Sequence, residues 1–197
     1  MQECRPVASL EDVQEKIEDE EEPPLSEVRL AQRMAGGLNW LATRTRPDIA
    51  FTVSPLASAA TRAPQRALAL GNRVLRYLAG TRTHGLQLRI PSCSQGSSGE
   101  SNRCEAVLEG FGDASYEEGW SQTGVLIKNR GMTVTWKSVK HIQVPRSTAE
   151  SEVTAMAFSA QYVEGLKALF EDIFVDLDTP HLVVRQSRGR PPDFISR

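Results

Sequence analysis

The sequence predicts an α/β (α+β) chain in which a helical segment precedes a mixed sheet with an antiparallel three-strand meander and a crossover helix. Between residues 27 and 80, apolar side chains recur at helical spacing. Between residues 107 and 138, three strand-like runs are separated by short turns. A long amphipathic helix and a short apolar run follow, so the last strand is reached through a helical crossover.

Proline and glycine residues divide the helical segment into three expected helices. They cover about residues 27–43, 48–60 and 64–79. Pro47 and Pro64 suit the first turns of the second and third helices, because proline has no N–H group to leave unpaired there. The pair Gly36–Gly37 weakens the first helix and predicts a close helix crossing or a kink.

The second half of the chain predicts strands, turns and one long helix. We expect strands over residues 85–90, 107–113, 123–128, 132–138 and 182–184. Residues 116–121 predict a loop, and the Ser- and Gly-rich residues 91–102 predict a flexible linker or a hairpin loop. The long helix begins at Ser147 or Thr148. Because this helix separates the last strand from the meander, we expect that strand to be parallel to the first.

Charge is distributed unevenly along the 197 residues. The formal net charge is -2 and the pI is near 6.0, so total charge gives no argument for binding to nucleic acid. The acidic run at residues 12–22 predicts a disordered tail over residues 1–25. Residues 29–90 contain ten arginines and one acid, Asp48. These arginines either contact phosphates or lie on solvated helix faces, and the sequence leaves both readings open.

Cysteine usage and hydropathy exclude several classes of protein. The chain has three cysteines and three histidines without metal-ligand spacing, so neither a zinc site nor a disulfide framework is predicted. No apolar run approaches the ~20 residues that cross a bilayer. We expect an intracellular protein, cytoplasmic or nuclear, with no membrane partner.

Two carboxylates are placed as in a metal-dependent nuclease. Asp113 lies in the run FGDAS, which predicts a strand with the carboxylate at its middle. Glu152 lies in the run STAESEVTAM, which predicts a helix that presents one carboxylate inward. Two Mg2+ ions about 4 Å apart, held by such oxygens, can bind the attacking and leaving oxygens of phosphodiester hydrolysis. The pair therefore indicates half of a two-metal site.

Several runs together resemble the C-terminal end of copia-type retrotransposon Pol polyproteins, over roughly residues 30–172. They are GLNWLATRTRPDIAFTVSPLA, RVLRYLAGT, GFGDASY, TGVLIKNRGMTVTWKSVKH and STAESEVTAM. In that family a helical connection follows the reverse transcriptase and leads into a ribonuclease H domain. The resemblance implies a helical connection segment over residues 26–84, an incomplete ribonuclease H-like domain over residues 85–187, and an irregular tail over residues 188–197.

The resemblance also assigns the two carboxylates. Asp113 becomes the first metal-binding aspartate. The family's glutamate stands in a pattern of Glu, an apolar residue, any residue and Ala, which Glu152 fits and Glu150 does not. The two glutamates lie about 200° apart around a helix, so they cannot bind the same metal ion. Glu150 instead adds negative charge to the first helical turn, where it complements the helix dipole.

The family's third carboxylate has no counterpart in this sequence. It belongs at the end of the last strand, where the run LVVRQS keeps Gln186 and Ser187 but has Val184 and Arg185. The fourth carboxylate belongs on a later helix that this chain does not reach. The nearby aspartates at positions 176, 178 and 193 read as loop or surface charges. We therefore expect weak Mg2+ binding and little or no hydrolysis of the RNA strand of an RNA–DNA hybrid, the substrate that the resemblance implies.

Four further residues are candidates for contact with nucleic acid: Ser115, Trp120, Lys137 and Lys140. Trp120, in the expected loop near Asp113, could stack on a base, as could Trp40. The lysines, expected after the third strand of the meander, could contact phosphates, and Ser115 could bond a substrate oxygen or stabilise a turn. The alternative to an enzyme is a noncatalytic remnant in which the arginine-bearing helices bind nucleic acid or the remaining Pol polyprotein.

Overall fold

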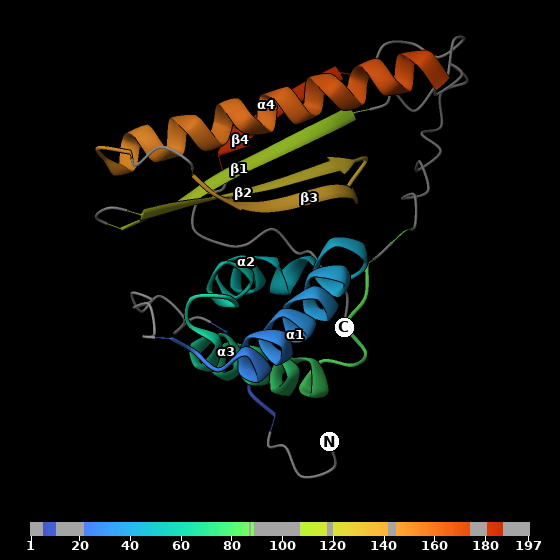
Figure 1. The fold of residues 1–197 in the computed structure, drawn as a ribbon. Coiled ribbons are helices and arrows are strands. Elements are labelled where there is room, and N and C mark those ends of the chain that lie inside the picture. Colours follow the sequence, from blue (N-terminus) through green and yellow to red (C-terminus); the bar gives the residue numbers. More distant parts are fainter. Residues whose placement is uncertain are drawn as a thin grey trace, which may run out of the picture. The chain divides into compact units, whose positions relative to one another are not determined.

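The computed structural model describes residues 6–10, 22–86, 88, 107–117, 120–141, 145–173 and 181–186. The chain divides into two compact units (Figure 1). The first contains helices α1 to α3. The second contains strands β1, β2 and β4, most of β3, and helix α4. Most of the expected acidic tail, the linker at residues 91–102 and the tail at residues 188–197 lie outside the described residues.

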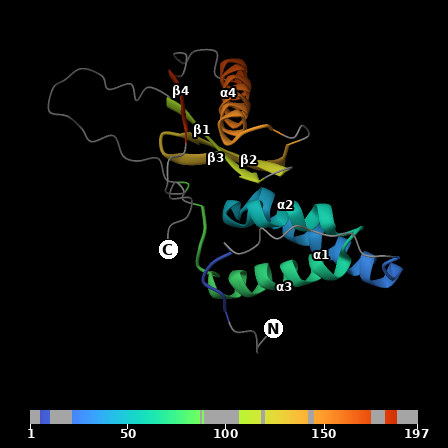
Figure 2. The same cartoon turned by 90° about the vertical axis from the view of Figure 1, so that its left-hand side faces the viewer.

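The helical unit confirms the three expected helices. They are α1 at Leu25–Arg44, α2 at Ala50–Ala59, preceded by a 3-10 turn at Pro47–Ile49, and α3 at Pro64–Gly80. Both prolines occupy first-turn positions, as predicted. The three helices pack pairwise against one another (Figure 2). Their largest fully buried side chains include Ile49, Leu56 and Val74, each of which stabilises the unit by about 1.5–3 kcal/mol through burial.

The predicted close crossing at Gly36–Gly37 is wrong. Helix α1 runs through both residues without interruption, and a Cβ added at either would meet nothing within 4 Å. The close contact lies at Gly71 of α3, where an added Cβ would overlap the side chain of Met34 and lie 2.9 Å from its Cγ atom. Helices α1 and α3 therefore approach closely at the buried Gly71, which faces Met34 of α1. Gly36 and Gly37 are exposed and take no part in this contact.

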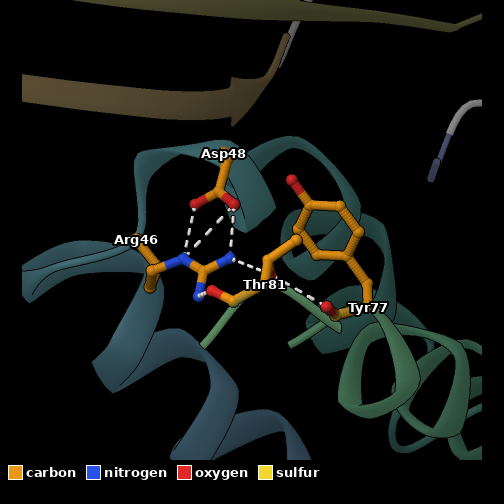
Figure 3. A network of polar contacts seen from close by, with 4 residues as sticks. All are labelled: Arg46, Asp48, Tyr77 and Thr81. Atoms are coloured by element: carbon orange, nitrogen blue, oxygen red, sulfur yellow. Dashed lines mark hydrogen bonds and ion pairs between the residues drawn. The ribbon is translucent and has the colours of Figure 1, made fainter. Parts of the chain in front are cut away.

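Arg46 forms a largely buried ion pair with Asp48 in the turn after α1, and its hydrogen bonds to Thr81 join this turn to the end of α3 (Figure 3). The guanidinium of Arg46 donates to both carboxylate oxygens of Asp48, with an Nη2–Oδ2 distance of 2.7 Å. It also donates to the carbonyl oxygen and the Oγ1 of Thr81, at 3.0 and 2.7 Å. The ring of Tyr77 lies 5.7 Å from the guanidinium carbon. The hydrogen bonds to Asp48 are the main reason that the pKa of Arg46 is raised.

The second unit contains a four-stranded mixed sheet. Its strands are β1 at Val107–Glu117, β2 at Trp120–Asn129, β3 at Met132–Lys140 and β4 at His181–Gln186, in the order β3-β2-β1-β4. Strand β1 pairs antiparallel with β2 and parallel with β4, as predicted. A two-residue turn joins β2 to β3, with positive φ at Arg130 and Gly131, which matches the twist of a hairpin. The predicted fold class is confirmed, and the sheet is compatible with a ribonuclease H-like fold.

Several strand boundaries differ from the predictions. The expected loop at residues 116–121 is wrong in its described part, because the β1–β2 pairing continues to Glu117 opposite Trp120, and residues 118 and 119 lie outside the described residues. Strand β3 extends to Lys140. The strand expected over residues 85–90 is also wrong in its described part, where only Gly85 forms a β-bridge and Leu86 and Leu88 lie in no strand.

Helix α4, at Thr148–Ile173, lies across one face of the sheet (Figure 1). Its buried residues recur every four positions and are mostly small: Ser151, Ala155, Ser159 and Val163. They face the glycines of β1. A Cβ added at Gly112 would lie 2.6 Å from the carbonyl oxygen of Ala155, and one added at Gly110 would lie 2.6 Å from Cγ2 of Val163. The missing side chains therefore allow α4 to approach β1 closely.

Among the residues that the structure describes, no helix combines the length and the apolar character needed to cross a membrane.

Candidate functional site

Asp113 lies within β1 as an exposed residue whose carboxyl group is partly desolvated. Its partner on β2 in the strand register is Gly124, which contributes no side chain beside it. The backbone amide of Ala114 donates to Oδ1 of Asp113 at 3.0 Å. Among the residues that the structure describes, this is the one hydrogen bond of the carboxylate, which has further lone pairs for a ligand.

Glu152 lies in the second turn of α4 and is half-buried. Desolvation is the main reason that the pKa of Asp113 is raised, and the negative charge of Glu152 raises it further. The hydrogen bond from Ala114 opposes both effects. The two predicted carboxylates are therefore close enough for their charges to interact, although they are 39 positions apart in the sequence.

Glu150 has a different environment at the beginning of the same helix. Its backbone amide donates to Oγ of Ser147 at 3.2 Å, which makes Ser147 the N-cap. Its carboxylate accepts a hydrogen bond from the amide of Arg146 at 2.6 Å. Glu150 therefore lies in the first turn of α4, as expected, and its carboxylate binds the amide of the residue before the N-cap.

A buried polar network fixes the first turn of α4 on the sheet. Oγ of Ser121 donates to Oγ of Ser151 at 3.2 Å, and both side chains are buried. The backbone amide of His141 donates to the carbonyl oxygen of Ser121 at 2.8 Å. The ring atom Nε2 of His141 forms a hydrogen bond with Oγ1 of Thr123. Burial lowers the pKa of His141, which favours the neutral ring. Because Ser151 precedes Glu152, this network also positions the glutamate.

Sequence reasoning missed this network. One signal was available, since Ser151 and Ser159 stand with Ala155 at four-residue spacing within a helix that is otherwise apolar on that face. Small polar residues at such spacing indicate a closely packed face. Which partner they meet depends on the tertiary fold.

The other predicted residues lie on strands β1, β2 and β3. Ser115 lies two positions along β1, on the same side of the strand, and is half-buried. Trp120 is half-buried at the first position of β2, and its predicted place in a loop is wrong. Lys137 and Lys140 lie within β3. Lys137 falls inside the predicted strand over residues 132–138, whereas the predicted place of Lys140 after that strand is wrong.

Lys137 already has a partner on α4. Its Nζ atom donates to the hydroxyl of Tyr162 at 2.9 Å and lies 5.6 Å from the centre of that ring. Lys140 is exposed at the end of β3. Within the described residues, Lys140 has no partner that would compete with a phosphate, whereas Lys137 does.

Strand β4 brings the cation of Arg185 beside β1, near the position of the third acid that the resemblance implies. Arg185 lies in register with Phe111, and its Nη2 atom is 3.6 Å from Oε1 of Glu109. Val184 lies in register with Gly110. Ser187 and the aspartates at positions 176, 178 and 193 lie outside the described residues. Within the described ranges, no group of three or more His, Cys, Asp or Glu side chains could hold a metal ion.

The donor set fits one divalent ion and does not fit two. Mg2+ is often bound by one or two carboxylates, with water or phosphate oxygens completing the octahedron. Asp113 and Glu152 could supply those two carboxylates, and a cation between them would relieve their mutual repulsion. Two ions require more negative charge than this pair carries, and the guanidinium of Arg185 adds positive charge on the neighbouring strand.

Two proteins of Arabidopsis thaliana are similar to most of the chain. It is 26% identical over 160 residues to the retrovirus-related Pol polyprotein from transposon RE1 and 25% identical over 160 residues to that from transposon RE2. Each match covers 79% of this chain and 10% of the relative. The chain is thus related to retrotransposon Pol polyproteins and spans about one tenth of their length. No protein-family model matches it.

A third relative is more similar in sequence and closer in length. The chain is 34% identical over 131 residues to secreted RxLR effector protein 161 of Plasmopara viticola. The match covers 64% of this chain and 83% of that protein. The chain belongs to the same family as effector protein 161.

The carboxyl group of Asp113 makes the stability of the chain depend on pH. Its pKa is higher in the folded chain than in the unfolded chain, so its ionised form disfavours folding. We expect Asp113→Asn, which resembles the protonated acid, to raise the urea midpoint of unfolding at neutral pH. The gain disappears as the pH falls below the ordinary carboxyl pKa, because the acid is then protonated in both states. Urea titrations of both proteins at several pH values test this, and an equal gain at every pH would contradict it.

Proposed function

We propose that the sheet unit is a ribonuclease H-like domain of copia-type descent that binds a single Mg2+ ion weakly through Asp113 and Glu152 and does not sustain hydrolysis of RNA–DNA hybrids. The observation that carries this proposal is the electrostatic interaction between the two carboxylates. Two carboxylates whose charges interact across a strand and a helix can together supply ligands to one divalent cation. The similarity to Pol polyproteins over 79% of the chain supports the same descent.

Two features support the lack of hydrolysis. The described residues offer no third carboxylate beside the pair. Arg185, held near Glu109, replaces negative with positive charge on the strand that pairs with β1. Cleavage by two metal ions requires ligands that neutralise both ions and fix them about 3.5–4 Å apart. A single weakly bound ion supplies charge for contact with a phosphate but not that arrangement.

Metal binding can be measured with Mn2+, which prefers the same oxygen ligands as Mg2+ and is paramagnetic. We expect Mn2+ to bind the full chain weakly and to broaden the NMR signals of β1 and the first turns of α4. Asp113→Asn and Glu152→Gln should each weaken this binding at least about tenfold, because each removes one of two anionic ligands. Glu150→Gln is the matched control, since it removes the same charge two positions from Glu152 and should leave binding unchanged.

Hydrolysis is tested on the same proteins with an end-labelled RNA–DNA hybrid and Mg2+. We expect no cleavage above that of a protein-free control. Cleavage by the wild-type chain that Asp113→Asn abolishes would overturn the proposed lack of activity. Equal Mn2+ binding by the wild type, Asp113→Asn and Glu152→Gln would overturn the proposed metal site.

A further inference from the structure

One side of α1 carries arginines and a tryptophan and has no acid. Arg29, Arg33, Trp40 and Arg44, here called the α1 stripe, lie within about 60° of one another around the helix axis. All four are exposed, and Trp40 is 61% exposed. The buried residues of the helix, such as Leu38, lie on the opposite side. The stripe therefore faces solvent along about 22 Å of helix, at 1.5 Å per residue.

The centre of the stripe is flat and open. Gly36 and Gly37 lie between Arg33 and Trp40, and a Cβ added at either would meet nothing within 4 Å. Neither glycine contributes a side chain between the Arg33 guanidinium and the Trp40 indole. The only acid in α1 is Glu27, which is half-buried and lies about 100° or more from each residue of the stripe.

The stripe differs from the other arginines of the helical unit. Arg46 is buried in its ion pair with Asp48. The four arginines of the α2–α3 turn and α3 each interact with another group of the chain: Arg62, Arg66, Arg73 and Arg76. Among the residues that the structure describes, Arg29, Arg33 and Arg44 have no hydrogen bond or ion pair. Their positive charge is therefore available to a ligand.

We propose that the α1 stripe is a binding surface for single-stranded nucleic acid, with Trp40 stacking on an unpaired base and the arginines contacting phosphates. An exposed indole offers a large π face that any unpaired base can cover. In a duplex the base faces are covered by their neighbours, so this contact is not available. A protein or membrane partner requires a broader apolar surface, and the exposed Leu30 lies to one side of the stripe.

This surface does not depend on the proposed metal site. None of its residues belongs to the sheet unit, and the contacts that it offers are noncatalytic. Asp113→Asn should therefore bind a single strand as tightly as the wild-type chain does. The metal-site proposal and this proposal can then fail independently.

Fluorescence anisotropy with labelled oligo(dT) of about 12 nucleotides, within the usual range of single-strand site sizes, tests the proposal on the full chain. We expect Trp40→Ala to weaken binding about 5- to 100-fold, the loss of one stacked base. Trp40→Phe should retain most of the affinity but lose the quenching of tryptophan fluorescence on binding. The logarithm of the association constant should fall with the logarithm of salt concentration with a slope of about −2, because single strands release about 0.7 counterions per phosphate contact.

Two matched variants control for surface and charge. Leu30→Ala removes another exposed apolar side chain of α1 and should not change binding. Arg33→Gln should reduce the salt slope by about 0.7. Arg82→Gln is the matched control, because it removes one exposed positive charge outside α1 and should leave the slope unchanged. Equal affinity for a duplex of the same length, or unchanged binding by Trp40→Ala, would overturn the proposal. Absence of binding at low salt would also overturn it.

Discussion

Asp48→Ala is expected to lower the free energy of unfolding of the helical unit by about 3–5 kcal/mol, the usual loss when one partner of a buried ion pair is removed. The side chains of Arg46 and Asp48 are only 9% and 12% exposed. Without Asp48, the guanidinium retains its hydrogen bonds to Thr81 but no negative charge. Urea unfolding followed by far-UV circular dichroism measures the loss.

Two variants separate the ion pair from general effects of charge and helix content. Arg44→Ala removes an exposed arginine two positions before Arg46 and should change stability by no more than about 0.5 kcal/mol. Arg46→Lys keeps the charge but cannot bind Asp48 and Thr81 at once in the same planar geometry, so an intermediate loss is expected. If Asp48→Ala were as mild as Arg44→Ala, the pair would contribute nothing to stability.

Gly112→Ala is expected to destabilise the sheet unit by about 3 kcal/mol, the upper end of the range for overpacking. The added Cβ would lie 2.6 Å from the carbonyl oxygen of Ala155 and 2.9 Å from its carbonyl carbon. These are backbone atoms, which cannot rotate away as a side chain can, so α4 itself must shift. Because Glu152 is one turn before Ala155, that shift also changes its separation from Asp113.

Hydrogen exchange of the β1 amides measures this effect within the sheet unit. Gly165→Ala is the matched control, because Gly165 lies in the same helix and a Cβ added there would meet nothing within 4 Å. That variant should stabilise α4 by up to about 1 kcal/mol through helix propensity. Similar exchange rates in Gly112→Ala and the wild type would show that the gap between α4 and β1 can widen at little cost.

The sequence predicted the helices and the order of the strands because both depend on local patterns. Apolar periodicity and the two prolines defined α1 to α3, and the short turns between the strand-like runs defined the meander of β1, β2 and β3. Strand lengths were underestimated, because pairing between β1 and β2 continues into polar residues that carry no strand pattern by themselves.

Glycine roles could not be predicted, since they depend on neighbours distant in sequence. A close helix crossing or a kink was predicted at the adjacent pair Gly36–Gly37, which is exposed. The close contacts lie instead at the single glycines Gly71, Gly110 and Gly112, where an added Cβ would overlap neighbouring atoms. The choice of Glu152 over Glu150 as the partner of Asp113 came from the family pattern, and the metal site that they would form stays a prediction. The partners of Lys137 and Ser151 required the folded structure.

The ion pair of Arg46 and Asp48 and its hydrogen bonds to Thr81 connect two stretches of sequence that are separate in the chain. One stretch, TRPDIAF, supplies both charged partners, and the other, RVLRYLAGT, supplies Tyr77 and Thr81. A domain with a total stability of only 5–15 kcal/mol cannot lose such a network and remain folded with a wide margin. Replacing an exposed metal ligand costs far less. Selection for the fold alone would therefore preserve these two stretches of sequence more strictly than exposed polar residues of the sheet unit.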